Sequence, residues 1–424
     1  MYIILFQSVS VILMVQQTWN VGKSMAVAHA NWDSQEQNVI NANRILLVTN
    51  VIHVVLASLI IHCVKVYLSS SVLITPFSFT FQIAFRAEHL YNLKYVSIFA
   101  GRTKVLVATG YVSGLERNTE IIDLEDASFK CTLSQFPASV YGATGGLVGN
   151  TALICGGGID TLTGWQYQNS CYSLKEDGDW KFETNLNEAR AYAANGDVIW
   201  NNKLVIAGGY NLSTIEVATP NAKSETLPIN LPIGIDRSCM VPWDTNTFMI
   251  IGGYGYDGDP RGQTHFIDMA NNRWTYGPSL LVPRYNFACH TMSVHDEDYI
   301  IVAGGYAYGE MIFSTEYLSK VNYESGWKLV KNSIDSILGV QLPVRMQRQE
   351  IVASKGNKFL YTIGNFYSHL DFYNNPLDKK IYKLECINSI TNCSWTKIST
   401  KLQYGRHSTV AMSIPNALSD KLCN

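Results

Sequence analysis

The sequence predicts an all-β protein, a six-bladed β-propeller closed by a C-terminal strand and preceded by an apolar N-terminal extension. Two observations support this fold. A glycine pair follows a short apolar run at a period of about 50 residues, which is the length of one four-stranded propeller blade. A second landmark, an arginine ahead of a glycine-pair strand, occurs once more near the C-terminus with no such strand after it.

The glycine pairs define the blades. Glycine can adopt positive φ, and it lets a neighbouring strand pass close by because it has no Cβ. A single pair would be an ordinary turn, but repetition at one period favours a structural unit repeated six times. Four pairs are complete, at Gly156, Gly157, Gly208, Gly209, Gly252, Gly253, Gly304 and Gly305, and weaker forms stand at Gly110 and Gly364.

A tryptophan follows four of the six glycine strands, after an intervening aromatic position. These tryptophans are Trp180, Trp274, Trp327 and Trp395, and we expect them to fill the wedge between neighbouring blades. The order of glycine pair, aromatic residue and tryptophan resembles the kelch repeat, over residues 101–414. The resemblance implies a propeller whose strand ends and loops around the central channel form the ligand surface.

The two ends of the repeat region complement each other. The arginine landmark stands at Arg190, Arg237, Arg284 and Arg345, and it recurs at Arg406 with no glycine strand behind it. The first blade begins directly with its glycine strand, residues 105–110, and lacks the strand that should precede it. We therefore expect residues 404–414 to complete the first blade, because ring closure leaves only short, protected edges. Residues 415–424 are left as a tail.

The five arginines are the candidate partner-binding residues. The resemblance places strand ends at the mouth of the central channel, and arginine there would suit an acidic partner. The alternative is that they hold carboxylates or carbonyls at blade junctions. Long loops rich in Gly, Tyr, Asp or Asn are expected to carry specificity. They span residues 158–168, 254–263, 306–313 and 365–378.

Composition limits the classes of partner. The chain has 424 residues, with 32 Lys and Arg against 34 Asp and Glu, a net charge of −2 and no basic block. This balance argues against nucleic acid as the main partner. Charged residues make up 16% and aromatic residues 12%, which suits closely packed strands and does not suit disorder.

Residues 1–100 do not share the repeat. The apolar run at residues 3–15 has the length of a signal-peptide core, so residues 1–30 are a possible signal peptide. A second apolar run, from Ile45 to Val64, is long enough to span a bilayer, although Asn50, His53 and His62 interrupt it. The extension is therefore either a signal or membrane anchor, or a segment outside the mature protein. It is too short and too apolar for the helical region of kelch ubiquitin-ligase adaptors.

The cysteines and two glycosylation triplets favour an oxidising compartment. Cys386 and Cys393 flank a hairpin turn, and Cys155 and Cys171 lie on what should be adjacent strands, so both pairs are disulfide candidates. Cys131 lies close upstream and leaves one cysteine of that group to pair elsewhere. Cys239 and Cys289 are expected to be buried thiols. The candidate acceptors Asn211 and Asn392 begin Asn-Leu-Ser and Asn-Cys-Ser.

These observations favour a non-catalytic kelch propeller that binds a protein through loops on one face, secreted or membrane-anchored. No catalytic residue, metal or cofactor is expected. The first alternative is an intracellular adaptor or scaffold of the ubiquitin-ligase or cytoskeletal type. The second is a kelch-fold copper oxidase, for which His290 and His407 are too sparse a ligand set.

Glycosidase digestion of the full-length chain expressed in animal cells tests the compartment. We expect a gel shift, because a translocated propeller would carry sugar on Asn211 or Asn392. An unshifted band, with the protein in the cytosol and its cysteines freely alkylated, would instead favour the intracellular scaffold.

Overall fold

The computed structural model describes two units of the chain separately. The propeller is described over residues 102–423, apart from residues 113, 116, 163, 332–338, 345, 347–348, 355 and 365–378. In the N-terminal unit, only the strands β1 (Ile4–Leu5), β2 (Ser10–Gln16) and β3 (Thr80–Ala84) are described, and they pair in that order. The possible membrane segment, residues 45–64, lies outside the described residues. None of the helices described is long and apolar enough to cross a bilayer.

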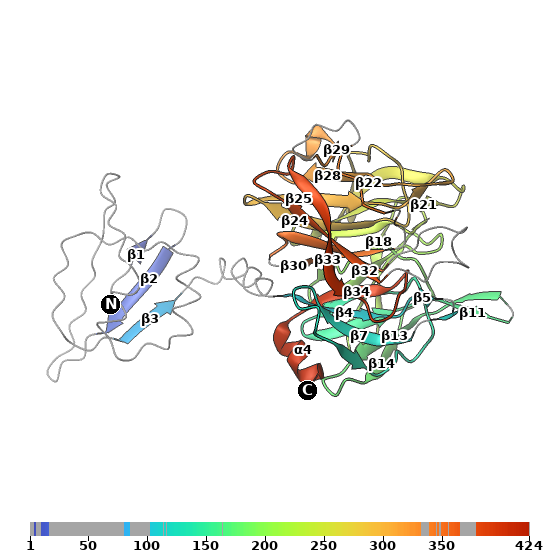
Figure 1. The fold of residues 1–424 in the computed structure, drawn as a ribbon, viewed down its shortest axis with the longest axis horizontal. Coiled ribbons are helices and arrows are strands. Elements are labelled where there is room, and N and C mark those ends of the chain that lie inside the picture. The colour runs from blue at the N-terminus through green and yellow to red at the C-terminus, as the bar shows by residue number, and fades with distance from the viewer. Residues whose placement is uncertain are drawn as a thin grey trace. The chain divides into compact units, whose positions relative to one another are not determined.

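Six four-stranded antiparallel blades form the propeller, which confirms the predicted fold (Figure 1). Blade 1 contains β34 (Val410–Ile414), β4 (Lys104–Ala108), β7 (Thr119–Asp123) and β8 (Cys131–Leu133), and blade 2 contains β9 (Thr144–Val148), β10 (Thr151–Cys155), β13 (Ser170–Leu174) and β14 (Trp180–Asn185). Blade 3 contains β15 (Ile199–Trp200), β16 (Lys203–Ala207), β17 (Thr214–Ala218) and β18 (Glu225–Asn230).

The other three blades repeat this arrangement. Blade 4 contains β20 (Cys239–Pro242), β21 (Thr247–Gly255), β22 (Pro260–Asp268) and β23 (Arg273–Gly277), with β19 (Ile235–Asp236) paired to the end of β21. Blade 5 contains β24 (Ala288–Val294), β25 (Glu297–Ala303), β28 (Thr315–Ser319) and β29 (Lys328–Leu329). Blade 6 contains β30 (Glu350–Ser354), β31 (Phe359–Ile363), β32 (Lys380–Cys386) and β33 (Cys393–Lys401).

The ring closes as the sequence predicts. Strand β34 pairs antiparallel with β4, from Val410 opposite Ala108 to Ile414 opposite Lys104. Figure 1 shows the red C-terminal strand beside this early strand of blade 1. The expected tail contains the helix α4 (Asn416–Cys423), which contacts β8 of the same blade. Both ends of the propeller are therefore fixed in blade 1.

The glycine pairs take the positive φ that the repeat implies. Gly156 and Gly157 have φ of 69° and 101°, and the complete pairs of the other blades are similar. A Cβ on Gly156 would lie 2.5 Å from the carbonyl oxygen of Arg190 in the next blade. Glycine is therefore required both for the backbone conformation and for the close approach of neighbouring blades.

Six apolar clusters form the core, one at each junction between neighbouring blades. Trp180 lies in the cluster between blades 1 and 2, Trp327 between blades 4 and 5, and Trp395 between blades 5 and 6. Trp274 packs against the cluster between blades 3 and 4. Each of the four tryptophans thus lies at a junction between blades, and its apolar contacts there supply part of the stabilisation of that junction.

A buried arginine and a buried glutamate form a clamp in each odd-numbered blade. In blade 3 the guanidinium of Arg190 lies 2.5 Å from the carboxylate of Glu216 on β17. The same arginine donates to the carbonyl oxygens of Gly208, at 2.8 Å, and Thr214, at 3.1 Å. Glu216 also accepts hydrogen bonds from the backbone N–H groups of Asn187 and Glu188. The clamp thus fastens the connection before the inner strand to the third strand of the blade.

The same contacts recur in blades 5 and 1. Arg284 pairs with Glu316 on β28 and donates to the carbonyl oxygens of Gly304 and Ser314. In blade 1 the partners are Arg406 and Glu120 on β7, 3.0 Å apart. Burial lowers the pKa of Arg284, and Glu316 opposes that shift. Burial raises the pKa of Glu120, and Arg406 together with two backbone N–H groups opposes it.

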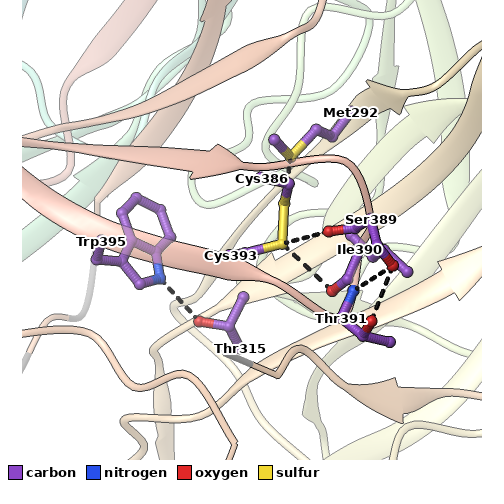
Figure 2. The surroundings of a disulfide bond; sticks show 8 residues. All are labelled: Met292, Thr315, Cys386, Ser389, Ile390, Thr391, Cys393 and Trp395. Carbon is purple, nitrogen blue, oxygen red and sulfur yellow. Dashed lines mark hydrogen bonds between the residues drawn. A yellow bond between two sulfur atoms is a disulfide. The ribbon is translucent and has the colours of Figure 1, made fainter. Parts of the chain in front are cut away.

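In the described part of the chain, four disulfides are formed: two within a blade, one between adjacent blades and one between β8 and the C-terminal helix α4. Cys155–Cys171 links paired residues of β10 and β13, and Cys386–Cys393 links β32 to β33, so both predicted pairs are confirmed. Figure 2 shows the second one beside Met292, with the Cys393 sulfur 3.2 Å from the carbonyl oxygen of Ile390. Trp395 on the same hairpin donates to the Thr315 hydroxyl at 3.0 Å.

The other two disulfides correct the sequence interpretation. Cys239 and Cys289 are bonded to each other and are not thiols. They lie on the inner strands β20 and β24 of adjacent blades, with Cα atoms 6.0 Å apart. Cys131, which was left without an assigned partner, pairs with Cys423 of α4. This bond holds the helix that follows the closing strand β34 to β8 of the same blade.

Replacing Arg284 with alanine should destabilise the propeller. The change leaves the Glu316 carboxylate buried without its cation, and breaking a buried pair costs about 3–5 kcal/mol. Arg273→Ala is the control, because Arg273 pairs with Asp268 at the surface and its loss should change stability little. Urea denaturation followed by tryptophan fluorescence measures the free energy of unfolding of both variants. Equal losses in the two variants would contradict the structural role of the clamp.

Two of the disulfides enclose loops of very different length and should therefore differ in their effect on stability. Cys131–Cys423 joins residues 292 apart in sequence, whereas Cys386–Cys393 joins residues 7 apart. Loop-closure entropy in the unfolded chain grows with span, so the paired Cys131→Ser and Cys423→Ser changes should cost more, within about 2–5 kcal/mol. The test compares the denaturation midpoint of this double variant with that of the variant carrying Cys386→Ser and Cys393→Ser. A larger fall for the short-span pair would be the contrary result.

Candidate partner-binding face

The structure separates the five predicted arginines into different environments. Arg190, Arg284 and Arg406 are fully buried in the clamps, so their guanidinium groups are not available to a partner. For these three, the contacts match the alternative interpretation, in which arginine holds carboxylates and carbonyls at blade junctions. The side chain of Arg237 is 21% exposed and pairs with Asp236. Arg345 lies outside the described residues, so its role stays a prediction.

The arginine landmark is out of register in blades 4 and 6. The N–H of the second glycine donates to the next blade, from Gly157 to the Arg190 carbonyl and from Gly253 to the Arg284 carbonyl. At the other two junctions with a complete glycine pair, the N–H of Gly209 donates to the Ile235 carbonyl in blade 4, and that of Gly305 to the Met346 carbonyl in blade 6. Arg237 therefore stands two residues beyond the clamp position, at a point where the chain reaches the axis of the ring.

In blades 1 to 5, a residue with positive φ precedes the inner strand near the axis of the ring. In blades 2 to 5 this residue donates its N–H to the carbonyl oxygen of its equivalent in the preceding blade: Gly142 to Ser408, Tyr192 to Gly142, Arg237 to Tyr192, and Asn286 to Arg237. Their φ values lie between 50° and 61°. Because this conformation turns the chain sharply, it brings the side chains beside these positions to one face of the ring.

Aromatic side chains form a belt on this face, defined here as Tyr111, Tyr141, Tyr192, Tyr254, Tyr285, Tyr306 and His407. His407 stacks on Tyr111 with ring centres 5.4 Å apart, and Tyr111 and Tyr192 each lie 5.8 Å from Tyr141. The guanidinium of Arg237 lies 4.6 Å from the centre of the Tyr192 ring and 5.8 Å from that of Tyr254, which joins the two parts of the belt.

The second part of the belt follows blades 4 and 5. The ring centres of Tyr254 and Tyr285 are 4.7 Å apart, and those of Tyr285 and Tyr306 are 5.6 Å apart. Backbone bridges join Tyr285 to Tyr306 and Tyr111 to His407. The belt thus crosses five of the six blades, and among its described members only Tyr141 and His407 are fully buried.

Among the described residues, a short hairpin, β5–β6 (Tyr111–Val112 and Gly114–Leu115), follows Gly110 in blade 1. Three longer hairpins rise from the same face, because each follows the glycine pair at the end of the second strand of its blade. They are β11–β12 (Gly158–Thr161 and Gly164–Tyr167), the joined ends of β21 and β22, and β26–β27 (Tyr306–Ala307 and Glu310–Met311). Figure 1 shows β11 extending beyond the blade. These hairpins correspond to three of the predicted long loops, and the fourth, residues 365–378, lies outside the described residues.

The hairpins carry large exposed apolar side chains. Leu162 and Trp165 stand on β11–β12, Tyr256 at the β21–β22 turn and Tyr308 on β26–β27. The Trp165 ring packs edge-on against Tyr141 with centres 4.9 Å apart, which connects this hairpin to the belt. We call the belt and the three hairpins together the hairpin face. An exposed apolar surface of this kind on a rigid scaffold is typical of an interaction site.

Electrostatics on the hairpin face are set by local pairs. Burial raises the pKa of Asp236, and the neighbouring Arg237 opposes the shift. A hydrogen bond from Arg261 lowers the pKa of Asp257 in the β21–β22 turn. Burial, followed by a hydrogen bond with Tyr210, raises the pKa of Tyr167. Each arginine here is therefore compensated by a carboxylate of its own segment.

The two glycosylation candidates lie at opposite ends of the blades. Asn211 is exposed in the connection between β16 and β17, at the end where the hairpins rise. Asn392 is half-buried in the turn between β32 and β33, at the other end. Their use as acceptors stays a prediction. Within the described part of the chain, His, Cys, Asp and Glu side chains form no group of three or more arranged to hold a metal ion.

Sequence reasoning missed the aromatic belt, although the signal was present. The landmark arginines and their neighbourhood contain an aromatic residue or histidine one or two positions later, as in Arg190-Ala191-Tyr192, Arg284-Tyr285 and Arg406-His407. The arginines were the predicted binding residues because their charge would suit an acidic partner. The structure buries the charge of these three arginines and leaves the Tyr192 and Tyr285 rings half-buried at the channel mouth, whereas His407 is buried.

Comparison with known proteins identifies the fold and goes no further. The solved structure of YjhT superposes with a TM-score of 0.57 at 12% sequence identity, over 70% of this chain and 97% of that one. At this identity the likeness shows the β-propeller arrangement alone. No family model matches the sequence, and no curated protein matches it. The comparisons therefore support the six-bladed propeller and leave membership of the kelch family as a resemblance in the repeat.

Proposed function

We propose that this chain is a non-catalytic module that binds a protein partner through the hairpin face. The aromatic belt is the observation that carries the proposal. It joins tyrosine rings from neighbouring blades into one surface, with Arg237 between two of them and Trp165 above. Tyrosine, tryptophan and arginine are the residues that contribute most binding energy at protein interfaces.

The physical setting of these side chains favours binding. Tyrosine and tryptophan offer a large contact area with few rotatable bonds, so little conformational entropy is lost when a partner covers them. Ring contacts within the belt restrict these rotamers further before any partner arrives. The backbone beneath is held by hydrogen bonds between blades. A pre-organised surface of this kind loses less free energy on association than a set of free loops.

The proposal places the protein in an oxidising compartment, secreted or held at a membrane. Its support is the four disulfides, which use eight of the nine cysteines. Reducing conditions in the cytosol keep such thiols unpaired in most proteins. The ninth, Cys63, lies outside the described residues. An intracellular adaptor would require these eight sulfur atoms to stay reduced, whereas they form four bonded pairs here.

Trp165→Ala tests the hairpin face. Peptides selected from a random display library on the disulfide-intact, full-length chain provide the ligands, and titration calorimetry measures their affinity. We expect the variant to bind at least about tenfold more weakly, because truncation of a central aromatic residue removes a large part of an interface energy.

Phe182→Ala is the matched control in the same blade. Phe182 is 56% exposed on the outer strand β14, whereas Trp165 is 59% exposed. Both truncations remove similar exposed apolar surface, so a general effect on the fold would appear in both. Selected peptides that lose affinity equally in the two variants, or in neither, would contradict the proposed face.

A further inference from the structure

Exposed charge on the hairpins is acidic, which is the opposite of what the arginine landmark suggested. Asp160 lies on β11, Asp257 and Asp259 lie in the β21–β22 turn, and Glu310 lies on β27; all four are exposed. Arg261 is the single basic residue in the three hairpins, and it pairs with Asp257. Three carboxylates, those of Asp160, Asp259 and Glu310, thus remain without a balancing cation in their own hairpin.

Among the residues that the structure describes, the positive charges nearest the axis do not change this balance. The clamp arginines are buried against Glu216, Glu316 and Glu120. Arg237 pairs with Asp236 at 3.0 Å and lies between two tyrosine rings. Exposed lysines at the start of β32, Lys379 and Lys380, belong to blade 6, whereas the acidic hairpins belong to blades 2, 4 and 5.

Each acidic side chain accompanies an exposed apolar one. Asp160 is near Leu162 and Trp165 in sequence on one hairpin, Asp259 follows Tyr256, and Glu310 follows Tyr308. A partner that covers these rings must place its own side chains opposite the carboxylates. Like charges brought together there would be unfavourable, and lysine or arginine would be favourable. The pattern of apolar residue and carboxylate therefore selects a partner of defined chemistry.

We propose that the partner of the hairpin face is a basic polypeptide segment that combines lysine or arginine with large apolar side chains. The inference rests on the proposed function, since it names the chemistry of the ligand for that same face. The belt and the exposed rings contribute apolar contact, and the hairpin carboxylates contribute charge complementarity and faster association. Affinity should fall as salt is raised, because exposed charges are screened beyond a Debye length of about 10 Å at 0.1 M salt.

The test compares two variants with the same change in net charge. Asp160→Asn, Asp259→Asn and Glu310→Gln together neutralise the hairpins. Asp179→Asn, Asp296→Asn and Glu324→Gln together neutralise three exposed carboxylates in turns at the opposite end of the blades. The ligands are again peptides selected from a random library on the disulfide-intact, full-length chain, followed by titration at low and high salt.

We expect selected peptides enriched in lysine or arginine together with aromatic or aliphatic residues. Their affinity should fall about tenfold in the hairpin variant and stay within about twofold in the control variant. Peptides that are neutral or acidic, yet still depend on Trp165, would overturn the basic partner and leave the proposed function standing. Peptides that are indifferent to Trp165, or a failure to select any peptide, would count against both proposals.

Discussion

A buried ion pair supported by hydrogen bonds to backbone groups organises this propeller. In each odd-numbered blade an arginine from the connecting segment reaches a glutamate on the third strand, together with two backbone carbonyl oxygens. Burying a charge is costly unless it has partners, and here the two terminal nitrogens of the Arg190 guanidinium and the Glu216 carboxylate bind each other and nearby backbone groups, while the buried Nε of Arg190 makes no hydrogen bond. The connecting segment, which has no strand pairing of its own, is fixed by this contact.

The clamps alternate with aromatic residues around the ring. At the position that holds glutamate in blades 1, 3 and 5, the even-numbered blades carry Tyr172, His265 and Tyr382. Trp180 of blade 2 donates to the Thr119 hydroxyl beside Glu120, and Trp395 of blade 6 donates to Thr315 beside Glu316. An aromatic blade therefore covers a charged one at these junctions, which keeps water from the ion pair and strengthens it.

The same arrangement explains the character of the hairpin face. Because the clamps retain three arginines inside the blades, the described residues at the mouth of the ring include tyrosines, the half-buried Arg237 and hairpin carboxylates. The backbone beneath takes positive φ at residues such as Tyr192 and Arg237, where it is unfavourable for a side chain. Contacts between blades hold that conformation, so the rings are presented by a rigid support.

The sequence by itself determined the number of blades, the closure of the ring in blade 1 and the disulfides Cys155–Cys171 and Cys386–Cys393. All of these follow from short-range order: the spacing of the glycine pairs, the strand missing at one end and present at the other, and cysteines on consecutive strands. Consecutive strands of a blade are neighbours in space, so their pairing can be read along the chain. The sequence also predicted part of the candidate face, because three of the long loops correspond to its hairpins.

Only the tertiary structure decided the rest. Cys239–Cys289 joins inner strands of adjacent blades, and Cys131–Cys423 joins the first blade to the C-terminal helix, so both depend on segments that the ring brings together. The sequence groups Arg237 with the arginines that prove to form clamps, because blade lengths differ and sequence spacing cannot show a shift of two residues. The side chains of Arg190 and Arg284 point inward because each binds a glutamate more than twenty residues away in the sequence. Whether a charge is buried or offered to a partner is set by contacts between segments distant in sequence, and these exist only in the folded chain.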